Sequence, residues 1–385
     1  MRPDHGTSAP NRSVILAGHF TPPVHGMAAA MDALGALLMT IGPLIRIRTV
    51  PKGRTRGRLY HLKRACLVSR AASRLLSLRV ESSALFLSVD AGAGMVYVIV
   101  LTWVARRLGY RVILQHHSYA YVSRRSRLAA TLVYVGGSRA VHLHSCQLAC
   151  DNFRRLYPRA LRTRALSVAY ALKTPPPSDR PTDVFISRRL IVGHLSNLTL
   201  EKGLEEVIRV GRAAVQHGIV ERVILAGPVT GRAERALLNS VRNEPGFEYR
   251  GPLTGQLKED FFRDIDLFLF PTRYRDESYG LVAWEAMLRG VPLIAYRAGC
   301  LTQTAVGSGN LVLQPSEDFT ACVLRRLEQW ARSPAQFVEA CAAAAAVARQ
   351  ERERAIADAL RLGTELFAPP TKPVNPCETT RVGNY

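Results

Sequence analysis

Two glutamates, Glu277 and Glu285, lie eight positions apart in the stretch RDESYGLVAWEAM at 275–287. The apolar run IDLFLFPT precedes this stretch, and GVPLIAY follows it. This order predicts a buried strand, a loop that carries Glu277, a helix that carries Glu285, and a further strand. With a helical rise between them, the two carboxylates would lie about 12 Å apart. A carboxylate can accept hydrogen bonds from two hydroxyl groups, so the pair suits the vicinal diols at the two ends of a nucleotide diphosphate-sugar.

The backbone amides between the two glutamates favour an anion. Tyr279, Gly280 and Leu281 are expected to open the helix, where free N–H groups and the helix dipole attract a diphosphate. Gly280 would let that backbone approach closely. The spacing alone is a weak pattern, and on this ground alone both glutamates could equally be solvent-exposed acids.

The wider stretch FLFPTRYRDESYGLVAWEAMLRGVPLIAY resembles the donor-site signature of GT-B glycosyltransferases, specifically the retaining family 4 type found in bacterial cell-surface polysaccharide assembly. The matching residues are Pro271, Thr272, Glu277, Tyr279, Gly280, Glu285, Ala286, Met287, Gly290 and Pro292. The resemblance implies transfer of a sugar from a nucleotide-sugar donor to a saccharide or a lipid-linked saccharide, with retention of configuration. It implies no metal and no cofactor beyond the donor itself.

A second stretch, VGHLSNLTLEKGLEEVIRV at 192–210, resembles the opening of the second domain of this family. There the resemblance implies that Lys202, followed by Gly203, contacts the donor diphosphate. An exposed helix lysine is the alternative. Many relatives carry an arginine a few residues earlier, whereas this chain has HLSN at 194–197, which removes one expected cation.

Two positions in the first half also match the family. ILAGHFTPPVHGMAAAM at 15–31 resembles the loop after the first strand and implies that Gly26 approaches the donor phosphate or the acceptor. VILQHHSYAY at 112–121 ends a strand with two histidines, of which His117 fits the family's sugar-binding histidine better than His116. A turn glycine and a structural histidine are the alternatives.

Strand and helix patterns alternate twice along the chain, which predicts an α/β fold with two doubly wound, Rossmann-like domains facing each other across a cleft. Strands are expected at 13–18, 44–50, 84–89, 111–116, 139–144, 189–195, 222–227, 266–270 and 292–296. The expected units are a basic N-terminal domain at 1–173, a donor-binding domain at 174–345, a C-terminal helix at 346–368 that packs back on the first domain, and a flexible tail at 369–385.

The charge of +22 is concentrated in the first half of the chain. Residues 1–175 carry 26 Lys and Arg against 5 Asp and Glu, and residues 33–150 contain only two acids, Glu81 and Asp90. The segment 58–79 predicts an amphipathic basic helix whose cations could lie on anionic lipid, although a solvated helix face is the alternative. No aromatic platform or known reader module accompanies these cations, so nucleic acid is not an expected partner.

The seven cysteines are scattered and are expected to be thiols in a reducing compartment. The N-terminus lacks an apolar signal region, so a cytoplasmic protein is expected, peripheral on the inner face of the cell membrane. Asp264 and Asp266 precede a strand rather than follow one, which argues against a metal site.

Two other functions remain open. A sugar-nucleotide epimerase can share this fold, and it would form product without any acceptor. A non-catalytic membrane-associated partner with a decayed donor site is suggested by the missing arginine.

Overall fold

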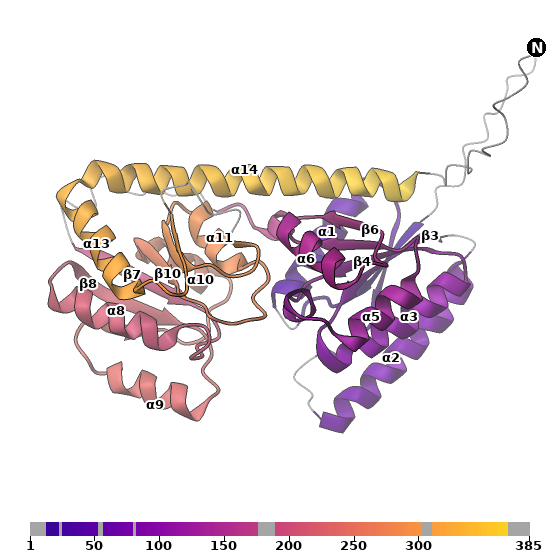
Figure 1. The fold of residues 1–385 in the computed structure, drawn as a ribbon, viewed down its shortest axis with the longest axis horizontal. Coiled ribbons are helices and arrows are strands. Elements are labelled where there is room, and N and C mark those ends of the chain that lie inside the picture. Colours follow the sequence, from indigo (N-terminus) through magenta and orange to yellow (C-terminus); the bar gives the residue numbers. More distant parts are fainter. Residues whose placement is uncertain are drawn as a thin grey trace, which may run out of the picture.

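The structure is a computed structural model with two α/β domains (Figure 1). It describes residues 13–22, 25–52, 57–79, 82–175, 189–301 and 310–368. Each domain is built around a sheet of six parallel strands covered by helices, so the α/β class and the two-domain organisation expected from the sequence are confirmed. No helix in this part of the chain is both long and apolar enough to cross a membrane.

The first domain has the strand order β2-β1-β3-β4-β5-β6. Its strands are β1 (Ser13–Gly18), β2 (Leu44–Arg48), β3 (Ser82–Val89), β4 (Arg111–His116), β5 (Val141–His144) and β6 (Arg162–Ala165). Its helices are α1 (Gly26–Met39), α2 (Gly57–Leu78), α3 (Met95–Arg107), α4 (Ala120–Ser123), α5 (Arg127–Gly136) and α6 (Gln147–Leu156), with short 3-10 turns η1 (Gly92–Gly94) and η2 (Val168–Ala171). Helices α2, α3 and α5 lie side by side over one face of the sheet.

The second domain has the strand order β12-β11-β10-β7-β8-β9. Its strands are β7 (Leu190–Leu195), β8 (Val220–Ala226), β9 (Phe247–Tyr249), β10 (Leu267–Phe270), β11 (Leu293–Tyr296) and β12 (Leu311–Leu313). Its helices are α8 (Leu204–Gln216), α9 (Arg232–Val241), α10 (Gln256–Asp264), α11 (Leu281–Leu288) and α13 (Phe319–Arg332).

Three strands were not expected from the sequence: β6, β9 and β12. All three lie at sheet edges and have only three or four residues. An edge strand has one neighbour and is partly exposed, so it needs no continuous apolar run. The inner strands, which are buried on both faces, have such runs, and each was expected close to its observed bounds.

A single long helix, α14 (Pro334–Phe367), runs along both domains (Figure 1). It packs on α11 in the second domain and on α1, η2 and the first sheet in the other. Small residues allow close approach at its far end, where a Cβ at Gly363 would lie 2.4 Å from the Ile41 side chain. The sequence analysis begins a C-terminal helix at 346, whereas this helix begins at Pro334. The expected tail at 369–385 lies outside the described residues.

Three histidines stack inside the first domain at the ends of β4 and β5. The rings of His116 and His144 lie 4.4 Å apart and nearly parallel, and His116 Nε2 lies 3.0 Å from His142 Nδ1. His116 Nδ1 also lies 3.1 Å from the Tyr121 hydroxyl. Burial lowers the pKa of His142 to about 4 and holds the pKa values of His116 and His144 well below 6.5. The three rings are therefore neutral at pH 7.

This stack should make the fold sensitive to acid. In the unfolded chain these histidines regain an ordinary pKa of about 6.5, so below that pH the unfolded state binds more protons and the free energy of unfolding falls as pH decreases towards 4. Each ring that stays neutral contributes about 1.4 kcal/mol per pH unit to this slope. We expect His142→Leu to reduce the stability difference between pH 6.5 and 5 by about 2 kcal/mol in urea titrations. The exposed His217→Leu should leave the slope unchanged, and equal slopes in both variants would contradict this account.

Candidate functional site

Lys202 and Glu277 form an ion pair at the carboxyl-terminal edge of the second sheet. Lys202 lies in the turn between β7 and α8, and Glu277 lies in the loop between β10 and α11. Strands β7 and β10 are neighbours, so parallel pairing brings the two loops together although they are 75 residues apart in sequence. The Lys202 ammonium also lies 4.5 Å from the centre of the Tyr274 ring. Both charged side chains remain partly exposed, at 19% and 12%.

The loop that carries Lys202 packs tightly on the end of β10. Gly203 has φ +88°, and a Cβ at this position would lie 2.4 Å from the Pro271 carbonyl oxygen. The backbone N–H of Arg273 donates to the Glu201 carbonyl oxygen at 2.8 Å. Gly203 is thus required both by its left-handed conformation and by the close approach, and these contacts fix the position of Lys202.

The helix behind Glu277 begins later than the sequence predicts. Gly280 is the N-cap of α11, in the left-handed region at φ +68°, and the first helical residue is Leu281. Three of the seven residues between Glu277 and Glu285, 278–280, therefore precede the helix, so the separation of about 12 Å expected from a helical rise does not apply. Glu285 pairs with Lys258 of α10 at 2.5 Å, and both side chains are about one-quarter exposed.

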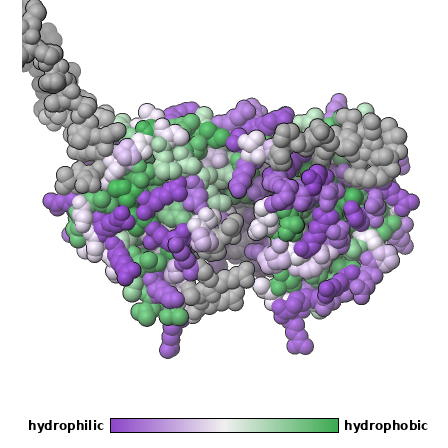
Figure 2. All heavy atoms as spheres, turned by 180° about the vertical axis from the view of Figure 1, so that it is seen from behind, coloured by the Kyte–Doolittle hydropathy of each residue, from purple (hydrophilic) through white to green (hydrophobic). Residues whose placement is uncertain are grey.

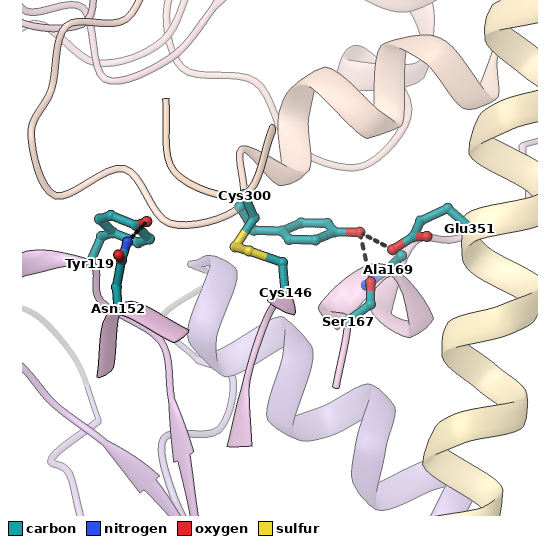
Figure 3. The surroundings of a disulfide bond; sticks show 8 residues. Tyr119, Cys146, Asn152, Ser167, Ala169, Cys300 and Glu351 are labelled. Atoms are coloured by element: carbon teal, nitrogen blue, oxygen red, sulfur yellow. Dashed lines mark hydrogen bonds between the residues drawn. A yellow bond between two sulfur atoms is a disulfide. The ribbon is translucent and has the colours of Figure 1, made fainter. Parts of the chain in front are cut away.

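The side chain of Tyr279 has a structural role. Its hydroxyl group lies 2.7 Å from Ser167 Oγ and donates to Glu351 Oε1 of α14 at 2.9 Å (Figure 3). The ring is buried and stacks on Trp284 at 5.6 Å. Burial and the carboxylate of Glu351 hold the pKa of Tyr279 well above 10. Only the backbone of Tyr279 is left for a ligand.

Gly26 lies across the domain boundary from α11. It is the exposed first residue of α1, and a Cβ at Gly26 would lie 3.7 Å from Leu281 Cδ1. The preceding residue, His25, caps α1 through Nδ1, which accepts from the Ala28 N–H at 3.3 Å. The first-domain loop and the N-terminus of α11 are thus adjacent, and the space-filling view shows an indentation between the two lobes (Figure 2).

His117 lies beside two further histidines and a carboxylate at the edge of the first sheet. Burial is the main cause that lowers the pKa of His117 to about 3; the nearby His19 and His25 also lower it, and Asp90 acts in the opposite direction. Its Nε2 is buried and has no hydrogen-bond partner among the residues that the structure describes. His116, by contrast, belongs to the buried stack. Of the two histidines, His117 is therefore the one with an unsatisfied nitrogen for a ligand.

A disulfide joins the two domains, contrary to the expectation that all cysteines are thiols. Cys146, the N-cap of α6, is bonded to Cys300, which follows β11 (Figure 3). The two residues are 154 positions apart, so spacing gave no indication of the pair. The Cys300 N–H donates to the Ser278 carbonyl oxygen at 2.7 Å, so the bridge ties the loop of Glu277 to the first domain.

Three residues with contacts in or near the candidate site were not expected from the sequence: Lys258, His19 and Arg64. Lys258 is the partner of Glu285, and its helix α10 was not expected because only Phe261 and Phe262 are buried on it. His19 directly follows the first predicted strand, so its position at a strand end was a usable signal. Arg64 lay within a cationic run and could not be distinguished from its exposed neighbours.

Asp264 and Asp266 both have partners within the second domain. Asp266 is buried and accepts from the Ile191 N–H at 2.8 Å, while Asp264 pairs with Arg250 at 2.6 Å. In the described part of the chain, no group of three or more His, Cys, Asp or Glu side chains could hold a metal ion. His194, of the divergent HLSN segment, is buried and bonds Leu269 O and Ser196 Oγ.

The disulfide should restrain the loop of Glu277. We expect a non-reducing digest to contain a peptide that links Cys146 to Cys300, and we expect Cys146→Ser to speed amide hydrogen exchange in residues 275–280 by releasing the tie through Ser278. Cys150→Ser is the matched control, because this buried thiol lies on the same helix outside the bridge. An unlinked digest, or equal exchange in both variants, would refute the restraint.

Comparisons with known proteins bear on the second domain and on the fold. Residues 189–329 match the family model described as "Glycosyl transferases group 1". A search of curated proteins gave no match. Among solved structures, HepE from Anabaena in complex with UDP-glucose is 16% identical with a TM-score of 0.66, over 91% of this chain and 98% of that chain.

Two further solved structures match over nearly the whole chain. Sucrose-phosphate synthase from Thermosynechococcus elongatus is 16% identical with a TM-score of 0.69, over 92% of this chain and 99% of that chain. A trehalose-6-phosphate synthase, studied for glycosyl transfer with retention, is 14% identical with a TM-score of 0.63, over 91% and 99%. At such identities the likeness shows the fold. The chain has the two-domain GT-B fold, and its residues 189–329 match the group 1 glycosyl transferases.

Proposed function

We propose that this protein is a glycosyltransferase that moves a sugar from a nucleotide-sugar donor to a saccharide or lipid-linked saccharide acceptor. The observation that carries the proposal is the Lys202–Glu277 pair, which lies within one loop of the N-terminus of α11 and close to the first domain. A cation, a sugar-binding carboxylate and free helix amides then occur together. The match of residues 189–329 to the group 1 glycosyl transferases supports the same conclusion.

The donor diphosphate is proposed to bind between Lys202 and the backbone amides of Gly280 and Leu281. A point cation and a helix N-terminus both favour negative charge, and that charge grows as the diphosphate departs. The turn that opens α11 requires glycine at position 280, because its φ is +68° and a Cβ there would lie 3.2 Å from the buried Phe270 ring. These groups could stabilise the leaving diphosphate without a divalent metal, which we propose is not required.

The sugar and the ribose are assigned to the two glutamates. Glu277, next to Lys202, is proposed to accept hydrogen bonds from the sugar, and Glu285 from the ribose hydroxyls. Lys258 forms an ion pair with the Glu285 carboxylate and offsets its negative charge. From the first domain, Gly26 is proposed to approach the phosphates, and the neutral His117 is proposed to bind a hydroxyl group of the sugar through its buried Nε2.

Retention of the anomeric configuration is also part of the proposal. It is supported by the resemblance of the site sequence to the retaining family 4 type and by the fold shared with the trehalose-6-phosphate synthase. The chemistry needs a stabilised leaving diphosphate and an oriented sugar that develops positive charge. Lys202 is proposed to stabilise the diphosphate, and the adjacent Glu277 is proposed to orient the sugar. UDP-sugars are the first donors to test, because HepE binds UDP-glucose.

The acceptor is proposed to be lipid-linked, in cell-surface polysaccharide synthesis, because the first domain has a surface suited to an anionic membrane. We call this the α2–α3–α5 surface. These three helices contain eight Lys and Arg and no carboxylate. They also bear seven of the twelve large hydrophobic side chains that are exposed in the described part of the chain: Leu59, Leu62, Leu76, Val96, Val100, Trp103 and Tyr134.

Cations and apolar side chains are interspersed on this surface, as membrane interfaces require. Arg107, for example, lies over the Trp103 ring at 5.2 Å. The cations predicted from the sequence on the 58–79 segment are exposed on α2: Arg58, Lys63, Arg70 and Arg74. A peripheral position on the inner face of the cell membrane is therefore the proposed location.

Lys63→Glu should weaken binding to anionic vesicles about thirtyfold, because it removes one positive charge and adds one negative charge, each worth about 1 kcal/mol near an anionic bilayer. The measurement is co-sedimentation with phosphatidylcholine vesicles, with and without phosphatidylglycerol. Arg232→Glu on α9 makes the same change in net charge in the other domain and should have little effect. Equal losses in both variants, or equal binding to the two vesicle types, would defeat the proposed surface.

Glu277→Gln should lower kcat/KM about tenfold to one hundredfold while preserving the fold, because a hydrogen bond to a charged group contributes about 1.5–3 kcal/mol. Donors are first selected by thermal shift with UDP-, ADP- and GDP-sugars, and transfer to a lipid extract is then measured. Glu244→Gln is the control, since this carboxylate pairs with Arg212 on another surface of the same domain. Unchanged turnover in Glu277→Gln would remove its assigned role, and product from donor alone would favour an epimerase.

A further inference from the structure

Three neighbouring strands of the first sheet are each followed at once by a titratable side chain. His19 follows β1, Asp90 follows β3, and His117 follows β4. Strands β1, β3 and β4 are adjacent and parallel, so their carboxyl ends meet at the edge where Gly26 approaches α11. The functional assignments above use His117 but neither His19 nor Asp90.

Asp90 forms an ion pair with a buried arginine. Arg64 of α2 is 3% exposed, and its Nη2 donates to Asp90 Oδ2. The guanidinium lies 4.6 Å from the Tyr97 ring centre. Gly94 leaves room for the pair, because a Cβ there would lie 2.9 Å from both Arg64 and Asp90. The pair is therefore enclosed by Tyr97 on one side and the backbone at Gly94 on another.

The other oxygen of Asp90 determines which nitrogen of His19 carries a proton. Asp90 Oδ1 lies 2.5 Å from His19 Nε2. Burial alone would raise the pKa of Asp90, but the hydrogen bonds and charges of His19 and Arg64 outweigh it and hold this pKa below its usual value. An ionised carboxylate only accepts hydrogen bonds, so Nε2 must be the donor. In the neutral ring, Nδ1 is then an acceptor.

Nδ1 of His19 has no hydrogen-bond partner among the described residues, and the side chain is 13% exposed. Its neighbours are His25, whose ring lies edge-on at 5.4 Å, and His117. Burial, followed by the effect of His19, lowers the pKa of His25, so both neighbours are neutral. The charged groups that face His19 are therefore Asp90 and, behind it, Arg64.

We propose that His19 is a further substrate-binding residue, whose Nδ1 accepts a hydrogen bond from a hydroxyl group of the saccharide acceptor, and that Asp90 and Arg64 are positioning residues that fix its tautomer. This inference rests on the proposed glycosyltransferase function. It assigns binding and orientation to His19 and no proton transfer.

The His19 ring with Asp90 behind it favours binding of a hydroxyl group over binding of a phosphate. A neutral nitrogen acceptor backed by a carboxylate would repel an anion, whereas it attracts an O–H donor. The second domain already supplies carboxylate acceptors for the donor sugar through Glu277. The attacking oxygen, in contrast, gains partial positive charge as its bond to the sugar forms, which a hydrogen-bond acceptor and the nearby Asp90 stabilise.

The first test needs no substrate. Long-range 1H–15N correlation spectra of protein labelled with 15N-histidine report the tautomer of each ring at neutral pH, and the signals of His19 are those absent from His19→Gln. We expect Nδ1 to be unprotonated and Nε2 to carry the proton, with Asp90→Asn shifting the population toward the other tautomer. A protonated Nδ1 in the wild-type protein would overturn the inference, and so would a tautomer population that Asp90→Asn leaves unchanged.

The second test uses His19→Gln, whose amide nitrogen reaches about as far as Nε2 and can still donate to Asp90, but which has no acceptor at the position of Nδ1. Labelled sugar is transferred from the UDP-, ADP- or GDP-sugar that gives product to a lipid extract of the producing cells. We expect kcat/KM for the extract to fall about tenfold, with the donor KM and nucleoside diphosphate affinity within twofold of wild type. The exposed His61→Gln is the control.

The outcomes separate the two levels of the proposal. A larger donor KM in His19→Gln, or kinetics equal to His61→Gln, overturns the role of His19 while wild-type transfer leaves the function intact. Absence of transfer by the wild-type protein with every donor rejects the proposed function, and the role of His19 with it. Asp90→Asn leaves Arg64 without its counter-ion and can fail to fold, so the kinetic test depends on His19→Gln alone.

Discussion

The candidate site depends on one constraint, which is that the carboxyl ends of all parallel strands in a sheet lie at the same edge. Parallel sheets place every carboxyl end at one edge, so residues distant in sequence become neighbours without any local pattern that joins them. In the second domain this places Lys202 beside Glu277, through the pairing of β7 with β10. In the first domain it places His19, Asp90 and His117 together. Each constellation is incomplete without the facing domain, because neither sheet edge alone offers both a cation for a diphosphate and a neutral acceptor for a hydroxyl group.

The arrangement of the two domains is fixed by contacts that have no catalytic chemistry of their own. Helix α14 spans both domains, and Glu351 on it accepts from the Tyr279 hydroxyl group while Tyr279 also contacts Ser167. The disulfide from Cys146 to Cys300 is a further link between the domains, and the Cys300 N–H donates to the carbonyl oxygen of Ser278, which precedes Tyr279 in the chain. The loop of Glu277 is thus held between a helix and a covalent bridge. This explains why a tyrosine that matches the donor-site signature has its side chain buried and only its backbone near the site.

The sequence predicted what local patterns encode and missed what only tertiary contact creates. Inner strands such as β7 and β10 were recognisable because burial on both faces demands apolar runs, while the edge strand β9 carries no such run. Lys202 and Glu277 could be found because their loops match a family signature. The partner of Glu285 could not be found, because Lys258 lies on a short and mostly polar helix with only two buried residues. The disulfide could not be predicted either, because its two cysteines are 154 positions apart and belong to no recognisable spacing pattern.

Helix α2 carries basic side chains both on its exposed face and in the interior of the first domain. Its outer face carries exposed cations, and the helix contains no carboxylate. The same helix turns Arg64 inwards, where a buried guanidinium must have a counter-ion. That partner cannot come from α2, α3 or α5, none of which contains an acid, so it comes from the end of β3. Residues 33–150 contain only two acidic residues, so Asp90 is conspicuous in the sequence. In the structure this aspartate makes an internal contact, the ion pair with Arg64. Because Arg64 pairs with only one oxygen of Asp90, the other oxygen is left to orient His19, and the charge pattern of α2 is linked in this way to the position of a side chain at the end of β1.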